Sequence, residues 1–464
     1  MKASRGVLLV ALALLAIAAL RDFVRLGDAL PWRQLYDFGD FYCAGAALDG
    51  HADPYRYEPL HACEHRVNLS AAYQHDPGRV VPAPLPPYDF PPFMLAARSS
   101  FSLARAIDAV AILLALLLAI WAIALCGVPL DLAAIALVLP AGYVLLNAGQ
   151  VVPFALVALA GCGAALALRR DGVAGILAAL TLIEPHLGLP VCVALFIWAP
   201  RSRLSIAATI LALALLGAWT LGISGAGEYL GRVLPAQAAA ETGYVYQYSL
   251  TYLLRTLGAS PAAALLLGEL SYLVALGAGV WLGGRVATGL GRRELLAYLP
   301  AACSVIGGPY VHMVDLPFAI PAALVLATTL DGRSRKIAAV ALALLAVPWI
   351  PAWTTKKLFL ASLFVVAVIL LRLRVRAPLA IGTFTAIAAT MYLFELAPPA
   401  PLAATSALFP PGALAQQAWQ EYVTRLGAAT PLWTAIKLPS WIALGALIAA
   451  ALGALRRGRN APQP

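Results

Sequence analysis

Two carboxylates in a short aromatic segment are the first candidates for chemistry. Asp37 and Asp40 lie in the run Tyr36-Asp-Phe-Gly-Asp-Phe-Tyr42. A carboxylate held near a membrane surface acts as a general base toward a hydroxyl group, and the rings beside it stack on sugar faces. The alternative is an acidic cap on an interfacial helix, which residues 41–48 predict. We take Asp37 and Asp40 as candidate catalytic residues and Tyr42 as a candidate substrate contact.

Two histidines lie where proline interrupts a long apolar stretch. His186 follows Glu184-Pro185, and His312 follows Gly307-Gly-Pro-Tyr. Histidine orients a phosphate or shuttles a proton near neutral pH, and ionisable groups at membrane depth are usually functional because they are costly. His312 is therefore a candidate catalytic residue, and Glu184 and His186 are candidate substrate contacts. In the structural alternatives, a backbone carbonyl or Asp315 satisfies His312, and Glu184 pairs with His186.

Amides and tyrosines elsewhere complete the candidate binding residues. Gln150 ends Asn147-Ala-Gly-Gln, which indicates either a tight turn or an amide that reaches a substrate. Gln247 lies in the aromatic run 244–249, which is equally typical of an interfacial aromatic belt. Tyr55 and Tyr88 belong to the first polar segment and are further candidate substrate contacts.

The composition predicts an all-α polytopic membrane protein. Of the 464 residues, 62% are hydrophobic and 12% are charged, whereas soluble domains carry about 25% charged residues. Apolar runs long enough to cross a bilayer recur, and their continuity excludes a membrane β-barrel. The candidate spans are residues 6–20, 106–126, 130–147, 150–168, 173–199, 204–222, 262–284, 294–330, 337–351, 358–371, 377–396 and 437–455.

Short basic clusters between these runs predict the orientation, because cytoplasmic loops are enriched in lysine and arginine. The clusters are Lys2/Arg5, Arg169/Arg170, Arg201/Arg203, Arg292/Arg293, Arg333/Arg335/Lys336, Arg372/Arg374/Arg376 and Arg456/Arg457/Arg459. Stretches 173–199 and 294–330 then begin and end inside, so each must be a hairpin, broken at 184–186 and at 307–310. This gives about 12–14 transmembrane segments. Lys356 and Lys357 are exceptions that the map places outside.

The same map brings all polar segments to the outer side of a cell membrane. These are loop 21–105, the Glu184-Pro185-His186 tip, loop 223–261, the His312 region and loop 397–436. Loop 21–105 is too long for a connector, holds His51, His61, His65 and His75, and is rich in aromatics, which argues for order. We expect residues 1–330 to form the functional module and 331–464 to add C-terminal helices. The run 6–20 resembles a signal peptide but fits better as an uncleaved first helix.

The cysteines, the net charge and the absence of known motifs restrict the functional classes to which the protein can belong. Cys43 and Cys63 share the first loop, where they form either a disulfide or two separate thiols; the other four cysteines lie in apolar runs, as packing residues do. The net charge is +10, but because the basic residues follow the positive-inside pattern, we expect no nucleic-acid partner. There is no P-loop, no Gly-x-Gly-x-x-Gly and no His-Glu-x-x-His motif.

An ordered set of short motifs resembles glycosyltransferase family 87, the polyprenol-phosphate-mannose-dependent mannosyltransferases, which have the C-type glycosyltransferase fold. The motifs are Asp37-Phe-x-x-Phe-Tyr42, Gly50, Asp53-Pro-Tyr55, Tyr88-Asp-Phe-Pro-Pro92, Gly149-Gln150, Pro185-His186 and Pro309-x-x-His312. The resemblance covers most of residues 1–330.

The resemblance implies a mechanism. A polyprenyl-phosphate hexose, with mannose as the expected sugar, is the donor, and a glycolipid or glycan hydroxyl is the acceptor. Asp37 removes the proton of the acceptor, the lipid phosphate leaves with inversion, and His312 is the functional histidine. No nucleotide, cofactor or metal is implied. Positive groups would stabilise the leaving phosphate; the candidates are Arg56, Arg66, His186, Arg255 and His312.

The chain departs from the family at two places. Glu184-Pro185 stands where Lys-Pro is common in the family, and the family's Asn-Gln-Ser-Leu pattern appears only as Tyr246-Gln-Tyr-Ser-Leu250.

Three other functions compete with glycosyl transfer. A lipid-linked sugar transporter or flippase also uses broken helices, but it needs charges near mid-membrane, where this chain has few. An oligosaccharide ligase or polymerase has its main outer loop late in the chain. A non-enzymatic scaffold is the third.

Overall fold

The protein is an all-helical assembly in which long apolar helices form the body. The computed structural model describes residues 2–24, 35–67, 76–354, 358–396 and 405–460. Within these residues, two isolated β-bridges are the extended pairings outside the helices. Six helices are long and apolar enough to cross a membrane: Phe101–Leu125, Leu130–Ala148, Pro200–Ala240, Pro261–Leu290, Ala377–Leu396 and Pro431–Arg456. Six shorter apolar helices are Val152–Ala167, Asp171–Ile183, Pro185–Trp198, Leu295–Ser304, Met313–Thr329 and Phe359–Arg372. This is the architecture of a multi-pass membrane protein.

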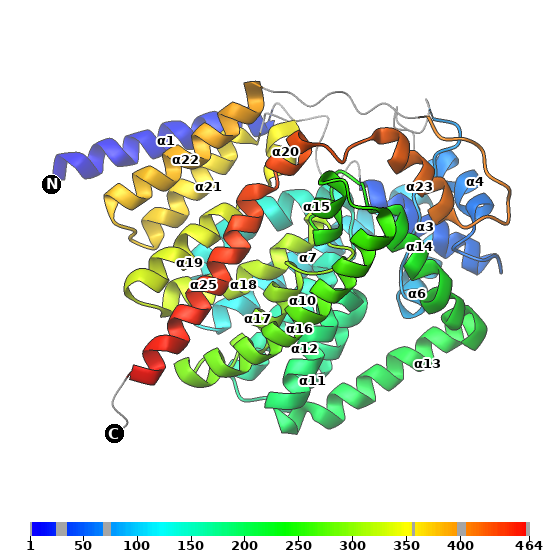
Figure 1. The fold of residues 1–464 in the computed structure, drawn as a ribbon, viewed down its shortest axis with the longest axis horizontal. Coiled ribbons are helices and arrows are strands. Elements are labelled where there is room, and N and C mark those ends of the chain that lie inside the picture. Colours follow the sequence, from blue (N-terminus) through cyan, green and yellow to red (C-terminus); the bar gives the residue numbers. More distant parts are fainter. Residues whose placement is uncertain (1, 25–34, 68–75, 355–357, 397–404, 461–464) are drawn as a thin grey trace.

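The central bundle and the polar end are separate regions of the molecule. In Figure 1, α10 (Val152–Ala167), α12 (Pro185–Trp198), α16 (Pro261–Leu290), α17 (Leu295–Ser304) and α18 (Ile320–Thr329) lie in the centre. The helices α3 (Tyr36–Asp49), α4 (Tyr57–Val67), α6 (Phe90–Ala97), α14 (Leu234–Ala240) and α23 (Ala415–Leu426) gather at the right of the view. The remaining helices include α1 (Lys2–Val24), which packs on α21 (Phe359–Arg372), and α19 (Gly332–Leu345), which packs on α25 (Leu438–Asn460).

Both hairpin breaks that the charge map requires are confirmed. The first hairpin consists of α11 (Asp171–Leu180), a 3₁₀ turn (Thr181–Ile183) and α12, with Glu184 in a non-helical conformation between them. Pro185 is the first residue of α12, where its missing N–H is harmless. The second hairpin is broken between Ser304, which ends α17, and Met313, which begins a 3₁₀ segment leading into α18.

Three of the seven basic clusters contact polar groups of other loops, in agreement with the positive-inside map. Arg293 forms an ion pair with Asp171 at 2.7 Å, and Arg372 forms one with Asp131 at 2.6 Å. Arg335 donates to the carbonyl of Leu373 at 2.7 Å. Loops that are far apart in the sequence therefore share one polar end. The exceptions, Lys356 and Lys357, lie outside the described residues.

The five polar segments that the map assigns to the outer side also meet. The N–H of Tyr57 donates to the carbonyl of Ala413 at 2.8 Å, and the N–H of Ala415 donates to the carbonyl of Tyr55 at 3.0 Å. Arg56 bridges Asp53 at 2.7 Å and Glu228 at 2.5 Å. Residues 413–415 of the C-terminal region thus contact the first loop at this polar end.

The helix α3 is confirmed over residues 41–48, but the prediction that it lies on the membrane surface is wrong. Ten of its fourteen residues are buried, and it packs against α6, α4 and α7 (Phe101–Leu125). Its close approach to α6 depends on Gly45, because a Cβ there would lie 2.4 Å from the backbone of Phe93. The apolar residues of α3 therefore form a core beneath the first loop. A short helix that is apolar on most sides suits such a buried position.

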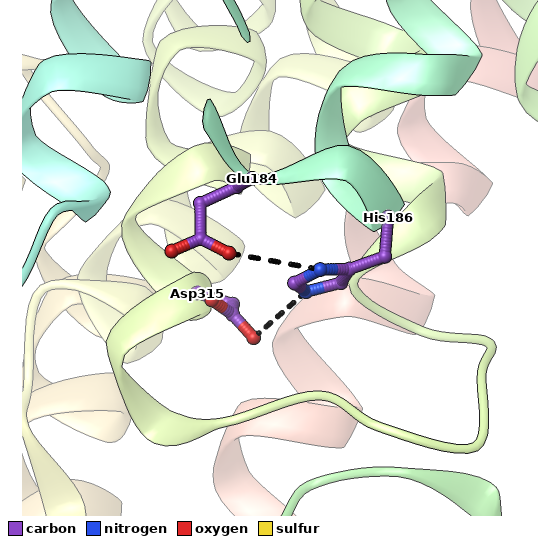
Figure 2. Close-up of side chains that lie close together, drawn as sticks. All are labelled: Glu184, His186 and Asp315. Atoms are coloured by element: carbon purple, nitrogen blue, oxygen red, sulfur yellow. Dashed lines mark hydrogen bonds and ion pairs between the residues drawn. The ribbon is translucent and has the colours of Figure 1, made fainter. Parts of the chain in front are cut away.

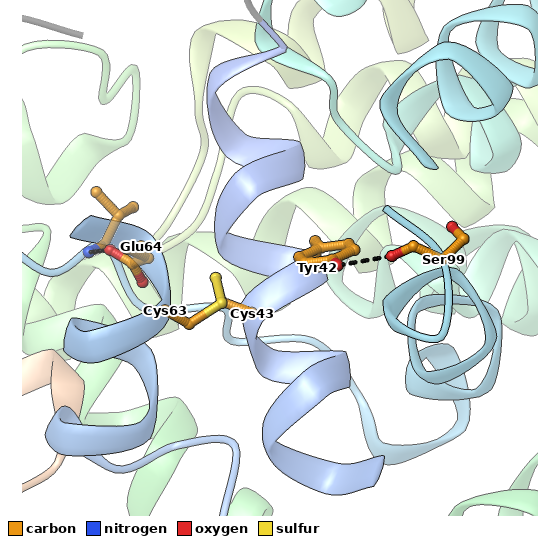
Figure 3. The surroundings of a disulfide bond; sticks show 6 residues. Tyr42, Cys43, Cys63, Glu64 and Ser99 are labelled. Atoms are coloured by element: carbon orange, nitrogen blue, oxygen red, sulfur yellow. Dashed lines mark hydrogen bonds between the residues drawn. A yellow bond between two sulfur atoms is a disulfide. The ribbon is translucent and has the colours of Figure 1, made fainter. Parts of the chain in front are cut away.

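Of the two alternatives for Cys43 and Cys63, a disulfide or two separate thiols, the structure has the disulfide. Cys43 of α3 and Cys63 of α4 are bonded, with a sequence separation of 20 (Figure 3). The other four cysteines are free and buried, which confirms their role as packing residues.

We expect the disulfide to stabilise the first loop strongly. Closing a loop of this length stabilises a fold by about 3 kcal/mol in the chain-entropy model. The Cys43→Ala/Cys63→Ala double variant should therefore melt at a lower temperature than the wild type by intrinsic fluorescence. Reductant should lower the melting temperature of the wild type and leave that of the double variant unchanged; a reductant effect of equal size on both proteins would contradict the prediction.

Candidate functional site

Asp37 and Gln150 meet where the start of α3 lies against a tight turn. Gln150 Nε2 donates a short hydrogen bond to Asp37 Oδ2. The turn follows α9 (Val144–Ala148), which ends at Gly149 with a φ of 71°. A Cβ on Gly149 would lie 2.9 Å from the Cβ atoms of Leu35 and Phe38. Both interpretations of Gln150 thus hold in part: the segment is a tight turn, and its amide reaches a candidate catalytic acid.

Gly149→Ala tests how strongly this contact positions Asp37. The positive φ alone costs an alanine about 1–2 kcal/mol, and overpacking costs about 1–3 kcal/mol more. Gly127 is a matched control, because its φ is 79° but a Cβ there would meet nothing within 4 Å. We expect Gly149→Ala to lower the melting temperature clearly more than Gly127→Ala. Equal melting temperatures for the two variants would mean that α3 does not press on the turn.

His312 is held by a short extended pairing with residues 246–248. The N–H of Tyr248 donates to the carbonyl of Val311 at 2.6 Å, and the N–H of Met313 donates to the carbonyl of Tyr246 at 2.9 Å. Gln247 is fully buried, and its Oε1 accepts the N–H of Val311 at 3.0 Å. Gln247 therefore fixes the backbone beside His312.

A buried carboxylate, Glu241, receives the imidazole of His312. Oε2 of Glu241 lies 3.1 Å from Nε2 of His312 and 3.4 Å from Nε2 of Gln247. Its Oε1 accepts Trp419 Nε1 at 2.5 Å and Gln237 Nε2 at 3.2 Å. Glu241 is only 2% exposed, so these donors replace the water that the charge has lost. The sequence reasoning missed it; the available signal was that loop 223–261 holds only two acids, Glu228 and Glu241.

The charges around Asp37 and His312 are linked. Burial raises the pKa of Asp37 to about 6, although the hydrogen bond from Gln150 and the charge of His312 act in the opposite direction. Burial lowers the pKa of His312, but the carboxylates of Glu241, Asp315 and Asp37 outweigh burial, so the pKa of His312 is raised. Near neutral pH this arrangement provides a mostly deprotonated acid under the electrostatic influence of an imidazole whose pKa is raised, a combination that suits a base and an anion-binding group.

A second polar cluster joins the two broken hairpins and is drawn in Figure 2. His186 Nε2 lies 3.2 Å from Asp315 Oδ2, and its Nδ1 lies 3.8 Å from Glu184 Oε2. The same Asp315 oxygen accepts the backbone N–H of His312 at 2.7 Å. The ring of Tyr310 stacks on His312 at 4.7 Å and meets the ring of His186 edge-on at 5.8 Å. Asp315 therefore connects this cluster to the His312 segment.

The first loop contributes an arginine to the site, and α23 contributes aromatic rings. Arg79 Nη1 donates to the hydroxyl of Tyr422 at 2.9 Å, and its guanidinium lies 4.7 Å from the centre of that ring. Its charge also acts on Asp37. Trp419 stacks on Tyr422 at 5.1 Å and meets Tyr244 edge-on at 5.1 Å. No motif or spacing in the sequence marked Arg79 or the aromatic residues of α23 as candidates for the site.

Several predicted residues lie outside this cluster. Asp40 is 2% exposed, so it is closed to an acceptor. Tyr42 donates to the carbonyl of Ser99 at 3.0 Å (Figure 3), and Tyr55 donates to the carbonyl of Leu85 at 2.8 Å. Tyr88 lies next to the first hairpin, where its hydroxyl donates to the carbonyl of Leu182 at 2.6 Å. These hydroxyls serve the packing of the first loop.

The predicted cations also differ in their positions. Arg56 is engaged by Asp53 and Glu228, Arg255 donates to the carbonyl of Ala259 at 2.6 Å, and Arg66 is exposed on α4. Of the candidate cations, His186 and His312 are the two that lie in the cluster. His75 lies outside the described residues.

Comparison of the chain with family models, with curated proteins and with solved structures finds no match.

Proposed function

We propose that the protein is a membrane glycosyltransferase that moves a hexose from a polyprenyl-phosphate sugar to a hydroxyl of a glycolipid or glycan. The observation that carries the proposal is that Gln150 donates a hydrogen bond to Asp37 while the charge of His312 acts on the same carboxylate. These three residues come from three distant parts of the chain, and each belongs to a motif of the family that the sequence resembles. Glu184 and His186, which belong to a further motif, are joined to them through Asp315.

In the proposed reaction, Asp37 is the general base. The hydroxyl oxygen of the acceptor attacks the anomeric carbon of the donor, and its proton passes to a carboxylate oxygen of Asp37. The bond between the anomeric carbon and the phosphate oxygen breaks, and its electron pair leaves with the polyprenyl phosphate. One displacement inverts the anomeric carbon. A pKa near 6 keeps Asp37 mostly deprotonated at neutral pH, yet basic enough to accept the proton.

Positive groups around the leaving phosphate would lower the barrier, because they stabilise charge that grows in the transition state. His312 and Arg79 both act electrostatically on Asp37, so they lie on the side of the cluster where the reacting atoms would sit. The aromatic rings of Tyr244, Trp419 and Tyr422 would provide faces for sugar rings. The disulfide between Cys43 and Cys63 favours an oxidising, extracytoplasmic compartment for this end.

The test is a transfer assay with purified protein, a membrane extract as acceptor and radiolabelled polyprenyl-phosphate mannose as donor. We expect label to move from this donor to the acceptor, and not from a nucleotide sugar. A ligase or polymerase would instead transfer an oligosaccharide block from a lipid pyrophosphate. A flippase would move the labelled lipid across vesicles without forming a new glycosidic bond. If no polyprenyl-phosphate sugar is a donor, the proposal is wrong.

A further inference from the structure

Glu184, His186 and Asp315 present three metal-ligating groups to one point. One ligand atom of each lies within 4.8 Å of the other two, and the nearest pair, His186 Nε2 and Asp315 Oδ2, is 3.2 Å apart. A divalent transition metal binds nitrogen and oxygen at about 2.0–2.2 Å, so neighbouring ligand atoms around it are about 3–3.5 Å apart. Small side-chain movements would bring the three ligands onto such a shell. Figure 2 shows both carboxylates turned toward the ring.

The negative charge in this region exceeds the positive charge that its ion pairs supply. In the part of the chain that the structure describes, His186 is the ion-pair partner of both Glu184 and Asp315, and no lysine or arginine pairs with either. A third carboxylate, Asp89, interacts electrostatically with Glu184. Its Oδ2 atom is buried and has no hydrogen-bond partner among the described residues. Two carboxylates that share one imidazole, next to a third carboxylate with an unpartnered buried oxygen, are an environment that a divalent cation would complete.

The cluster is firmly held but still reachable. The carbonyl of His186 accepts the hydroxyl of Tyr272 at 2.8 Å, which fixes the start of α12. The Glu184 and His186 side chains keep 17% and 23% of their surface exposed. One imidazole and two carboxylates suit Mn²⁺ or Zn²⁺, and three protein ligands leave coordination positions open for another oxygen.

We propose that Glu184, His186 and Asp315 bind a divalent cation whose open coordination positions take the phosphate oxygens of the lipid-linked donor. The role toward the phosphate rests on the proposed function, whereas the binding of the cation does not. Asp315 also accepts the backbone N–H of His312, so a cation here would lie beside the segment that carries the second histidine. The cation would neutralise the phosphate as it leaves, although the family resemblance implies no metal.

Metal binding is measured first, without any donor. Full-length protein in detergent, purified without a polyhistidine tag and treated with chelator, is titrated with Mn²⁺ and followed by electron paramagnetic resonance. We expect one site per chain, competition by Zn²⁺, and at least tenfold weaker binding in Glu184→Gln and in His186→Ala. His61→Gln/His65→Gln is the matched control, because it removes a second histidine pair, on α4 with rings 4.5 Å apart, and should leave the site intact.

The outcomes separate the cation from the proposed function. Wild-type protein that binds no stoichiometric Mn²⁺, or Glu184→Gln and His186→Ala variants that fold and bind as the wild type does, would overturn the inference. For the phosphate role, polyprenyl phosphate in nanodiscs should change the Mn²⁺ signal of the wild type, and inorganic phosphate should do so more weakly. Sugar transfer that persists unchanged after metal removal would refute the phosphate role alone. Mn²⁺ binding without any sugar transfer would refute the proposed function and leave the cation site standing.

Discussion

Asp37→Asn should lower kcat for hexose transfer by about 10²–10⁴-fold, which is the usual contribution of a positioned general base. The amide keeps the size of the side chain and can still pair with Gln150, but it cannot accept the proton of the acceptor hydroxyl. Donor binding depends on other groups, so the KM for the donor should change little. Steady-state transfer from radiolabelled polyprenyl-phosphate mannose measures both quantities.

Asp40→Asn is the matched control for this experiment. Asp40 lies one turn further along α3 and is buried, so its substitution should affect the melting temperature more than kcat. Folded Asp40→Asn protein that loses transfer as completely as Asp37→Asn would contradict the assignment of the base to Asp37 alone. Retained transfer by Asp37→Asn would remove the proposed mechanism altogether.

The pH profile gives an independent measure of the same group. Because burial raises the pKa of Asp37 to about 6, log kcat/KM should rise with pH up to that value and level off above it. The hydrogen bond from Gln150 acts to lower this pKa, so Gln150→Leu should move the inflection to higher pH. An inflection that stays in place in Gln150→Leu would assign the titration to another residue.

The sequence predicted the topology well because charge and proline act at long range and in a regular way. Placing the seven basic clusters on one side of the membrane implied that two apolar stretches are hairpins, and Pro185 marked the break of the first at Glu184. Once sidedness is assigned, Asp37, His186 and His312 must share one end of the molecule. Asp315 joins His186 to the His312 segment, and the charge of His312 acts on Asp37, to which Gln150 donates. The topology thus predicts which residues lie at the same end of the molecule, but it does not predict the distances between their side chains.

The partners of these side chains were less predictable, because they depend on packing that leaves no pattern in the sequence. Glu241 and Trp419 are 178 residues apart, and only the docking of α23 onto the end of α14 brings them together. The partners of the tyrosines of the first loop were unpredictable for the same reason. Tyr42 and Tyr55 look suited to sugar stacking, but α3 folds inward and their hydroxyls are taken by nearby backbone carbonyls. The sequence shows that a segment is rich in aromatic residues, but the tertiary fold determines whether their rings face the protein core or a substrate.

Glu241→Gln should cost the enzyme most of its activity although Glu241 does not touch the reacting atoms. The carboxylate raises the pKa of His312 and accepts a hydrogen bond from its Nε2, so the neutral amide should lower the pKa of His312 and weaken its positive charge. The leaving phosphate would then lose a positive group, and hydrogen bonds to charged partners contribute about 1.5–3 kcal/mol. We expect kcat/KM to fall by roughly 10–100-fold, since about 1.4 kcal/mol corresponds to tenfold. The loss should be smaller at acidic pH, where His312 is protonated without help.

The matched control is Glu228→Gln, which removes an acid of the same loop. Glu228 pairs with Arg56 at 2.5 Å and has no hydrogen bond to His312 among the described residues. Both variants should lose stability, so melting temperatures must be compared before rates. Only Glu241→Gln should shift the titration of His312, which NMR of the imidazole measures directly, to lower pH. If both variants lose the same activity and neither moves that titration, Glu241 serves the fold alone, and His312 owes its charge to Asp315 and Asp37, the other two carboxylates that raise its pKa.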